Sequence, residues 1–398
     1  MDPEMLPIIG ARLQILSELS DRLATRREAL VAAATQDIGT PCRCANMEVD
    51  LAVQHLKTMA VEVPYVEGKA PYGTVADILP YDASLVVLAW VGGAAILGGN
   101  RFRFSCSSQT PRTARLLAEA VAPFPCFEAV TGMDNRLFGE QCIADPQVRV
   151  MLISGGGAVG DTFARAAHAF DKLFFGGPSG LPPLILFRDA PLEVAVPILV
   201  RRAFLNGGQY CTTIKRAYIH RDIYEQARQM ILERMAEIKV GDPMDPDTWI
   251  GPIKVARTRK LIDRVLAALK EPCFLVPPHR EGEWHGPFLV ETPEPPDLEL
   301  FGPFLALVPI ESDAAAVAQV LKSRYPFSVS YFGTPPPGAR EALSQTFGMV
   351  FANPEFLFVP LRLPFGGKGA SGWIMERQNG RLIKRDGTFI YSAELVRG

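Results

Sequence analysis

The sequence lacks an excess of charge of either sign. Its 41 Lys and Arg residues are offset by 43 Asp and Glu residues, so no electrostatic bias favours nucleic acid or an anionic membrane. Basic clusters such as residues 254–260 have no interleaved aromatic residues and are typical of the polar face of a helix. We therefore predict that the protein binds neither nucleic acid nor a membrane.

The sequence also lacks a recognisable address signal and a clear membrane span. Its first residues have neither the basic and apolar regions of a secretory signal nor the Arg-rich amphipathic character of an organelle signal. The longest uncharged run, Ala83 to Asn100, contains four glycines and lies at the lower length limit for a membrane span. We predict that this run forms a buried strand and a buried helix, and that the protein is cytoplasmic.

Cysteine is too sparse for a disulfide framework. The seven cysteines are an odd number spread over a long chain. Cys42 and Cys44 could begin a metal site, but no second cysteine pair and no histidine-rich segment accompanies them. We predict no metal, and each cysteine is then either a packing residue or a free thiol.

What the sequence does contain is apolar material for more than one core. Its 398 residues, 48% of them hydrophobic, exceed what a single core usually organises. Strand-like runs alternate with helical runs, which predicts parallel sheets covered by helices. The predicted strands are 74–79, 84–89, 127–131, 148–153, 184–187 and 216–220. The predicted helices are 13–34, 49–61, 110–121, 135–143, 158–171, 192–204 and 224–238.

The strongest cluster of Gly and Pro, residues 176–183, interrupts this alternation. We place the main domain boundary there. The predicted fold is therefore two α/β domains, each with a mainly parallel sheet. The first domain spans 1–175 and is completed by the C-terminal segment 373–398, and the second spans 176–372.

Cys211 is the strongest candidate for a reactive group. It lies between a predicted helix and a predicted strand, next to Gly207 and Gly208, which leave space around the sulfur. An arbitrary free cysteine is most often a small packing residue. The string of residues 204–211, Phe-Leu-Asn-Gly-Gly-Gln-Tyr-Cys, nevertheless resembles the active-site signature of the aldehyde dehydrogenase superfamily, in which the thiol attacks an aldehyde carbonyl.

Other segments resemble further motifs of that family, in the family's order. They are the glycine turn at 153–160, Gly-Asp-Pro at 241–243 with Gly-Pro at 251–252, Glu-Leu-Phe-Gly-Pro at 299–303, and Pro-Phe-Gly-Gly at 364–367 with Ser-Gly at 371–372. The resemblance covers the chain from about residue 11 to residue 391. It implies the family's two-domain α/β fold and a nicotinamide cofactor, NAD or NADP.

The glycine turn has a physical interpretation of its own. A turn from strand to helix with Gly155, Gly156, Gly157 and Gly160 lets the backbone approach a phosphate, which the free N–H groups of the helix then bind. Such turns also occur for packing reasons alone. We assign these four glycines to the cofactor site.

The resemblance also assigns Glu299 to the cofactor's ribose hydroxyls and Phe301 to its nicotinamide ring. Without the resemblance they would be a solvated acid and a core aromatic residue. The family's Lys and Glu ligands of the adenosine ribose align with Ser105 and Ser108. Cofactor binding is therefore predicted to be weak or to use other groups, such as Arg101 or Arg103. The choice between NAD and NADP stays open, with a slight preference for NADP.

Two departures from the family concern the chemistry itself. Asp82 stands where the family has an Asn that stabilises the oxyanion, and a carboxylate there would repel an oxyanion unless it is protonated. Gly177 stands where hydrolytic members have a Glu that activates water. The segment 177–183 is instead similar to a loop of members that transfer the acyl group to coenzyme A.

These features predict an NAD(P)-dependent oxidoreductase that forms a thiohemiacetal and then an acyl thioester on Cys211, with Asp82 in the catalytic site. Its partners would be a small aldehyde or acyl thioester, with coenzyme A or a carrier thiol as the possible acyl acceptor. Two alternatives stay open. One is a non-redox thiol acyltransferase or thioesterase, and the other is a catalytically silent binding protein. The oligomeric state stays open, with a homodimer as the candidate assembly.

Overall fold

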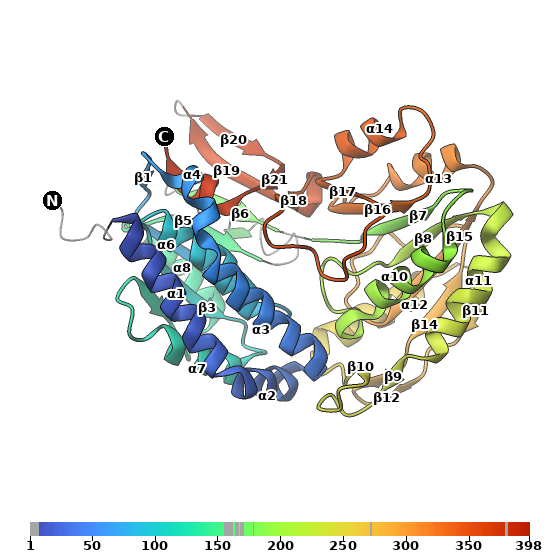
Figure 1. Cartoon of the computed structure of the whole chain (residues 1–398), viewed down its shortest axis with the longest axis horizontal. Helices are drawn as coiled ribbons and strands as arrows, with labels where there is room; N and C mark the ends of the chain where they lie inside the picture. The colour runs from blue at the N-terminus through green and yellow to red at the C-terminus, as the bar shows by residue number, and fades with distance from the viewer. Residues whose placement is uncertain are drawn as a thin grey trace.

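The computed structural model describes residues 8–154, 162–163, 167, 171–177, 179–270, 273–378 and 381–398. Two seven-stranded sheets organise them, one in each half of the molecule (Figure 1). Most neighbouring strands in both sheets run parallel, and helices pack on the sheets. The predicted α/β class with two mainly parallel sheets is therefore confirmed.

The first sheet has the strand order β20-β19-β6-β5-β2-β3-β4. These strands are, in chain order, β2 (Thr74–Leu79), β3 (Arg101–Cys106), β4 (Phe127–Ala129), β5 (Val148–Ile153), β6 (Leu173–Gly176), β19 (Trp373–Gln378) and β20 (Arg381–Arg385). The strands from β6 to β4 run parallel, whereas β19 pairs antiparallel with both β6 and β20. The C-terminal strands thus return to the half in which the chain begins (Figure 1).

Helices of the N-terminal half pack around this sheet. They are α1 (Ile9–Thr25), α2 (Arg27–Ile38), α3 (Cys42–Lys57), α4 (Val63–Val66), α5 (Ser84–Val87), α6 (Gly93–Leu97), α7 (Pro111–Val121) and α8 (Asn135–Ala144), with a 3₁₀ turn at Met59–Glu62 and a π-helical turn at Leu88–Gly92. The predicted helix 13–34 is therefore two helices that meet at Arg26. No Gly or Pro marks that break, so the sequence carries no signal for it.

The second sheet has the order β11-β14-β15-β8-β7-β16-β17, with only β11 antiparallel to its neighbour. Its strands are β7 (Pro183–Leu186), β8 (Arg216–His220), β11 (Cys273–Val276), β14 (Phe288–Glu291), β15 (Phe304–Ile310), β16 (Ser328–Phe332) and β17 (Met349–Ala352). Its helices are α10 (Leu192–Phe204), α11 (Arg221–Ala236), α12 (Ala256–Ala268), α13 (Asp313–Val320) and α14 (Ala339–Thr346). Separate apolar clusters lie on the two faces of this sheet.

Short elements complete the described chain. Paired short strands are β1 (Ala70–Pro71) with β22 (Val396–Arg397), β9 (Lys239–Val240) with β10 (Thr248–Ile250), β12 (Arg280–Glu281) with β13 (Trp284–His285), and β18 (Phe365–Gly367) with β21 (Gly387–Phe389). Short helical turns are Leu205–Gly208, Gly369–Ser371 and α15 (Tyr391–Glu394). The predicted helix 158–171 lies largely outside the described residues.

The prediction of a strand at 84–89 was wrong. These residues form α5 and the start of the π-helical turn, and they pack against α3. The run is apolar without alternation, so its periodicity does not distinguish a buried strand from a buried helix. The next strand of the sheet is β3, which the sequence hides because Arg101 and Arg103 interrupt its apolar residues.

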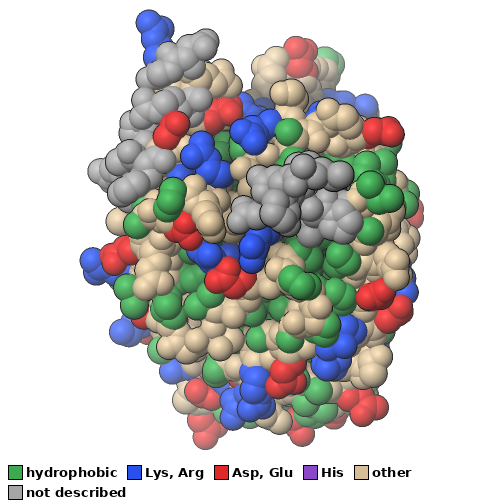
Figure 2. Space-filling model, turned by 90° about the vertical axis from the view of Figure 1, so that its left-hand side faces the viewer, with side chains coloured by type: hydrophobic (Ala, Val, Ile, Leu, Met, Phe, Trp, Pro, Cys, Tyr) green, Lys and Arg blue, Asp and Glu red, His purple; other side chains and the backbone are tan. Residues whose placement is uncertain are grey.

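Charged side chains of both signs are mixed on one face of the molecule. On the face shown in Figure 2, acidic and basic side chains are interspersed among apolar and neutral ones. This agrees with the balanced composition. Among the residues that the structure describes, no helix combines the length and the apolar character of a membrane span.

One buried acid conflicts with the apolar core of the first sheet. Asp77 lies in the middle of β2, between Val75 and Leu79, which are both fully buried core residues on the same face of the strand. Neither of its carboxylate oxygens has a hydrogen-bond partner among the described residues. Burial therefore raises the pKa of Asp77 well above its usual range. The fold therefore favours the neutral form of this carboxyl group.

A raised pKa makes the stability depend on pH. Because the unfolded chain ionises Asp77 near pH 4 and the folded chain resists ionisation, folding stability falls as pH rises, by up to about 1.4 kcal/mol per pH unit. We expect Asp77→Asn to unfold at a higher temperature than the wild type at pH 7, and the gain to shrink toward pH 4. Asp247→Asn, at an exposed site between β9 and β10, is the control. If the difference between the wild type and Asp77→Asn is constant over this pH range, the account is contradicted.

Candidate active site

A cavity of about 360 Å³ lies where the carboxyl ends of β2 and β5 face the loop that follows α10. Both halves of the chain contribute to its wall. The residues in its wall that can donate or accept a hydrogen bond, or that bear a thiol or a flat ring, include Tyr81, Asp82, Ser107, Asn135, Ser154, Tyr210, Cys211, Thr212, Thr258, Glu299 and Phe301. Four predicted site residues, Cys211, Asp82, Glu299 and Phe301, thus share one cavity.

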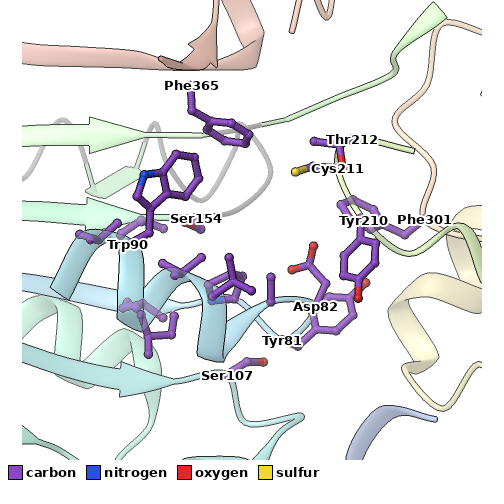
Figure 3. A pocket seen from close by; sticks show the side chains of 18 of the residues that line it. Tyr81, Asp82, Trp90, Ser107, Ser154, Tyr210, Cys211, Thr212, Phe301 and Phe365 are labelled. Atoms are coloured by element: carbon purple, nitrogen blue, oxygen red, sulfur yellow. The ribbon is translucent and has the colours of Figure 1, made fainter. Parts of the chain in front are cut away.

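Cys211 is presented by an unusual stretch of backbone. Asn206, Gly207 and Gly208 all have left-handed backbone angles, with φ of 51°, 61° and 71°. Gly208 must be glycine, because a Cβ there would lie 2.1 Å from the carbonyl oxygen of Gly302. The turn places the sulfur of Cys211 at the edge of the cavity (Figure 3). Cys211 is half-buried, whereas five other cysteines are buried and Cys273 is exposed.

Negative groups and burial keep the Cys211 thiol protonated. Burial, with the carboxylates of Asp82 and Glu299 adding to it, raises the pKa of Cys211 well above its usual range. A thiol is a poor nucleophile until it loses its proton. The site therefore needs a base, and no histidine belongs to the described wall of the cavity.

Asp82 is the group best placed to serve as that base. It follows β2 in the loop before α5, and its carboxylate points into the cavity on the side of Cys211 (Figure 3). Burial, reinforced by the charge of Glu299, raises the pKa of Asp82 to about 7. A carboxyl group of this pKa exists in both protonation states near neutral pH, so it can take a proton and return it.

Glu299 and Phe301 lie on the second-sheet side of the cavity. Glu299 accepts a hydrogen bond of 3.1 Å from the backbone N–H of Gly180, and burial raises its pKa. The ring of Phe301 lies 6.3 Å from the ring of Tyr81, measured between centroids. The Tyr81 hydroxyl is 3.0 Å from the hydroxyl oxygen of Thr258. Both predicted residues therefore face the cavity beside an ordered tyrosine.

The other predicted cofactor residues are placed differently. Ser105 is buried, and its hydroxyl donates to the side-chain oxygen of Asn135 over 2.9 Å, so Asn135 rather than Ser105 reaches the wall of the cavity. Arg103, one expected substitute, is engaged by Glu128 and Asp145 at 2.8 and 2.7 Å. Arg101 begins β3, at the end of the sheet remote from the cavity. The glycines 155, 156, 157 and 160 lie outside the described residues.

Gly177 is closed to any side chain. Its φ is +105°, and a Cβ would lie 2.7 Å from the Cα of Gly372 and 3.0 Å from the carbonyl oxygen of Ser371. A Glu cannot replace this glycine without moving the segment around residue 372. Asp82 and Glu299 are the carboxylates in the described wall of the cavity.

One part of the cavity is aromatic and aliphatic. The Trp90 ring lies 4.5 Å from the ring of Phe365 and 5.2 Å from that of Tyr391, measured between centroids, with edge-on geometry in both pairs. Val86 and Leu361 also line this region. Figure 3 shows Trp90 and Phe365 across the open space from Asp82.

Two buried groups near Cys211 were not predicted from the sequence. Glu48 of α3 is buried and accepts a hydrogen bond from the hydroxyl of Tyr210, the residue before Cys211. Burial raises the pKa of Glu48 to about 8. Glu48 and Asp82 also line a second, much smaller cavity. The available signal was an acid on the apolar face of a helix, beside Cys44, Ala45 and Val49. The second such group is Lys215, a buried lysine four residues after Cys211.

Comparison with known proteins identifies the family of the chain. The sequence model described as "Aldehyde dehydrogenase family" matches residues 8–385. The chain therefore belongs to the aldehyde dehydrogenase family, and its reaction class is that of an oxidoreductase of the aldehyde dehydrogenase type.

Individual relatives are distant but similar over most of their length. A 3-sulfolactaldehyde dehydrogenase of Priestia aryabhattai is 25% identical over 393 residues, covering 91% of this chain and 81% of the relative. A 2-aminomuconic semialdehyde dehydrogenase of Bos taurus is 26% identical, with the same coverage. Among solved structures, a glyceraldehyde-3-phosphate dehydrogenase of Methanocaldococcus jannaschii, complexed with NADP, superposes with a TM-score of 0.84 at 21% identity and covers 99% of this chain and 89% of its own. At that identity it supports the fold.

The electrostatics of the site predict how Cys211 reacts. Alkylation by iodoacetamide follows the equilibrium fraction of thiolate and does not need the proton transfer to Asp82 that turnover needs. Replacing Asp82 with Asn removes a negative charge beside the sulfur, so the pKa of the thiol should fall and more thiolate should be present. Since Asp82 is mostly neutral below pH 7, Asp82→Asn should accelerate labelling of Cys211 by iodoacetamide more at pH 8.5 than at pH 6. Peptide mass spectrometry follows Cys211 separately from the exposed Cys273, whose labelling is the internal control. A rate ratio that does not change with pH would show that Asp82 does not titrate beside the thiol.

Proposed function

We propose that the protein is an NAD(P)-dependent aldehyde dehydrogenase that passes its acyl group to a thiol rather than to water. The observation that supports this most directly is the closed environment of Gly177, where hydrolytic relatives are expected to have a Glu. Without that base, attack of water on an acyl thioester is slow, because a positioned base contributes about 10²- to 10⁴-fold to such a step. Coenzyme A or a carrier thiol brings its own thiolate.

The residues of the site can carry the proton transfers of this reaction. Cys211 adds to the aldehyde carbon, and its proton moves to the carboxylate of Asp82. Protonated Asp82 then donates that proton to the oxyanion, which yields a neutral thiohemiacetal. Asp82 takes the proton back from the hydroxyl during oxidation. What the bound cofactor supplies is a hydride acceptor, so oxidation leaves the acyl group on Cys211 as a thioester.

Release of the acyl group follows from the same geometry. The acceptor thiolate attacks the thioester carbonyl, a new carbon–sulfur bond forms, and Cys211 leaves as a thiolate. Protonated Asp82 returns the proton to Cys211, which restores the starting state. No water needs to be activated in this sequence, so a base at position 177 is dispensable.

The described residues fit a dinucleotide. Open α/β sheets bind such ligands at the carboxyl ends of their parallel strands, and the cavity meets the first sheet at Leu79, Ser107 and Ser154, just at or after the ends of β2, β3 and β5. Phe301 and Glu299 would hold the nicotinamide end. At the adenosine end the described wall contains Asn135 and Arg136.

The cofactor assignment leads to a proposed function for each of the two domains. Residues 1–175 with 373–398 would be the dinucleotide-binding domain, and residues 176–372 the catalytic domain. The glycines 155, 156, 157 and 160 remain assigned to the phosphates, and the choice between NAD and NADP remains open. A homodimer also remains a prediction.

The substrate proposed from the cavity is an aldehyde with an apolar tail. Trp90, Phe365 and Leu361 offer apolar surface beside Cys211, and no cation in that region would hold an anionic tail among the described wall residues. Burial of a methylene group contributes about 0.8 kcal/mol. Each added methylene should therefore strengthen binding until the cavity is filled.

The acceptor is tested by supplying an apolar aldehyde and NAD(P)⁺ with and without coenzyme A. We expect a burst of NAD(P)H of about one equivalent without coenzyme A and steady turnover at least about tenfold faster with it. Cys211→Ala should abolish both signals. Equal steady rates in the two conditions would contradict the acylating proposal and indicate an unidentified base.

The alternatives have their own outcomes in this experiment. Acylation of Cys211 by a thioester without any NAD(P)H formation would favour the non-redox acyltransferase or thioesterase. Neither NAD(P)H nor acylation would favour the silent binding protein. A titration of NADH and NADPH into the purified chain separates loss of cofactor binding from loss of chemistry.

A further inference from the structure

Lys215 is a buried lysine beside the active site that the reaction above does not use. It lies four residues after Cys211, directly before β8, and only 1% of its surface is exposed. Its amine donates hydrogen bonds to the carbonyl oxygens of Gly208, over 2.8 Å, and Gly302, over 2.6 Å. These two glycines belong to the two segments that carry Cys211 and Phe301.

The same two glycines also touch each other through their backbones. The N–H of Gly302 donates to the carbonyl oxygen of Gly208 over 2.9 Å. A Cβ at Gly208 would lie 2.1 Å from the oxygen of Gly302 and 2.5 Å from the Lys215 amine. We call this set of three bonds the Gly208–Gly302 junction. It forms only because Gly208 has no side chain.

Burying this amine is unfavourable. Among the described residues no carboxylate lies within ion-pairing distance of Lys215, and burial lowers its pKa to about 7. A buried polar group that lacks an opposite charge must be satisfied by hydrogen bonds. Both hydrogen bonds that Lys215 donates go to the carbonyl oxygens of Gly208 and Gly302. The buried amine therefore stabilises the contact between these two residues.

We propose that Lys215 is a positioning residue that keeps the loop bearing Cys211 in register with the segment bearing Glu299 and Phe301. Gly208 precedes the nucleophile by three residues, and Gly302 directly follows Phe301. A shift at the junction therefore moves the sulfur relative to the nicotinamide face of the cavity. The inference rests on the proposed function only through the roles of Cys211 and Phe301.

Two variants of similar length separate hydrogen bonding from packing. Lys215→Met removes the donors, whereas Lys215→Gln keeps two N–H groups without charge. We expect kcat to fall about tenfold to a hundredfold in Lys215→Met, since small misplacements of reacting groups have effects of this size. Lys215→Gln should remain within about threefold of the wild type. If Lys215 only filled space, Lys215→Met would be as active as Lys215→Gln.

The chain offers a matched control in Lys172. This buried lysine also donates to two backbone carbonyl oxygens, those of Asp145 over 2.7 Å and Val148 over 2.5 Å, at the end of the first sheet remote from the cavity. Lys172→Met should lower the thermal unfolding midpoint as Lys215→Met does. It should leave kcat unchanged.

A second readout does not depend on turnover. Iodoacetamide labelling of Cys211 is measured with and without saturating NAD(P)⁺ in all four proteins. In the wild type, Lys215→Gln and Lys172→Met, the cofactor should change the labelling rate by the same factor. In Lys215→Met this factor should fall toward one, and the rate without cofactor should differ from the wild type by at least about tenfold.

The outcomes decide the proposal separately from the function. It is overturned if Lys215→Met keeps both the wild-type kcat and the wild-type labelling rates, or if Lys172→Met changes them equally. If Lys215→Met does not fold, Lys215→Gln decides: wild-type values support the proposal, and a loss of more than about tenfold overturns it. If the wild type neither binds NAD(P)⁺ nor turns over, the proposed function fails, and the labelling rates without cofactor still test the junction.

Discussion

Burial of the ionisable groups around Cys211 is the constraint on which the site depends. Burial raises the pKa values of the thiol, Asp82, Glu299 and the neighbouring Glu48 in the same direction. Three carboxyl groups and a thiol cannot all ionise together in so small a volume. The site therefore retains protons at neutral pH, and it retains them where an oxyanion would form. An Asp in place of the family's oxyanion-binding Asn is consistent with this surplus, because a protonated Asp donates a hydrogen bond.

Backbone geometry makes this arrangement possible. The left-handed run from Asn206 to Gly208 and the closed position of Gly177 leave no room for side chains at two points around the cavity. The first exclusion allows two chain segments to meet behind the nucleophile. The second leaves no room for a Glu side chain at position 177. Both features limit which side chains can reach the cavity.

The sequence predicted what short segments encode. The string ending in Cys211, the strand 74–79 and the alternation around both sheets are local patterns, and the structure has them. The helix 84–87 was predicted as a strand because a uniformly apolar run has no period to measure. Glu48 was missed because its partner, Tyr210, lies far from it in sequence. Lys215 was missed because its partner Gly302 is also distant and accepts through a backbone oxygen. The contacts of Ser105 and Arg103 were hidden for the same reason, since each is engaged by residues of another element.

Formation of an acyl thioester on Cys211 is the central claim, and intact-protein mass spectrometry tests it most directly. The purified protein is mixed with an apolar aldehyde and NAD(P)⁺ in the absence of any thiol acceptor, quenched in acid and mapped by peptide. The account predicts a mass increase of one acyl group on the peptide containing Cys211, which disappears when coenzyme A is added before the quench. Free carboxylate accumulating with no acyl group on Cys211, or an acyl group on another residue, would contradict it.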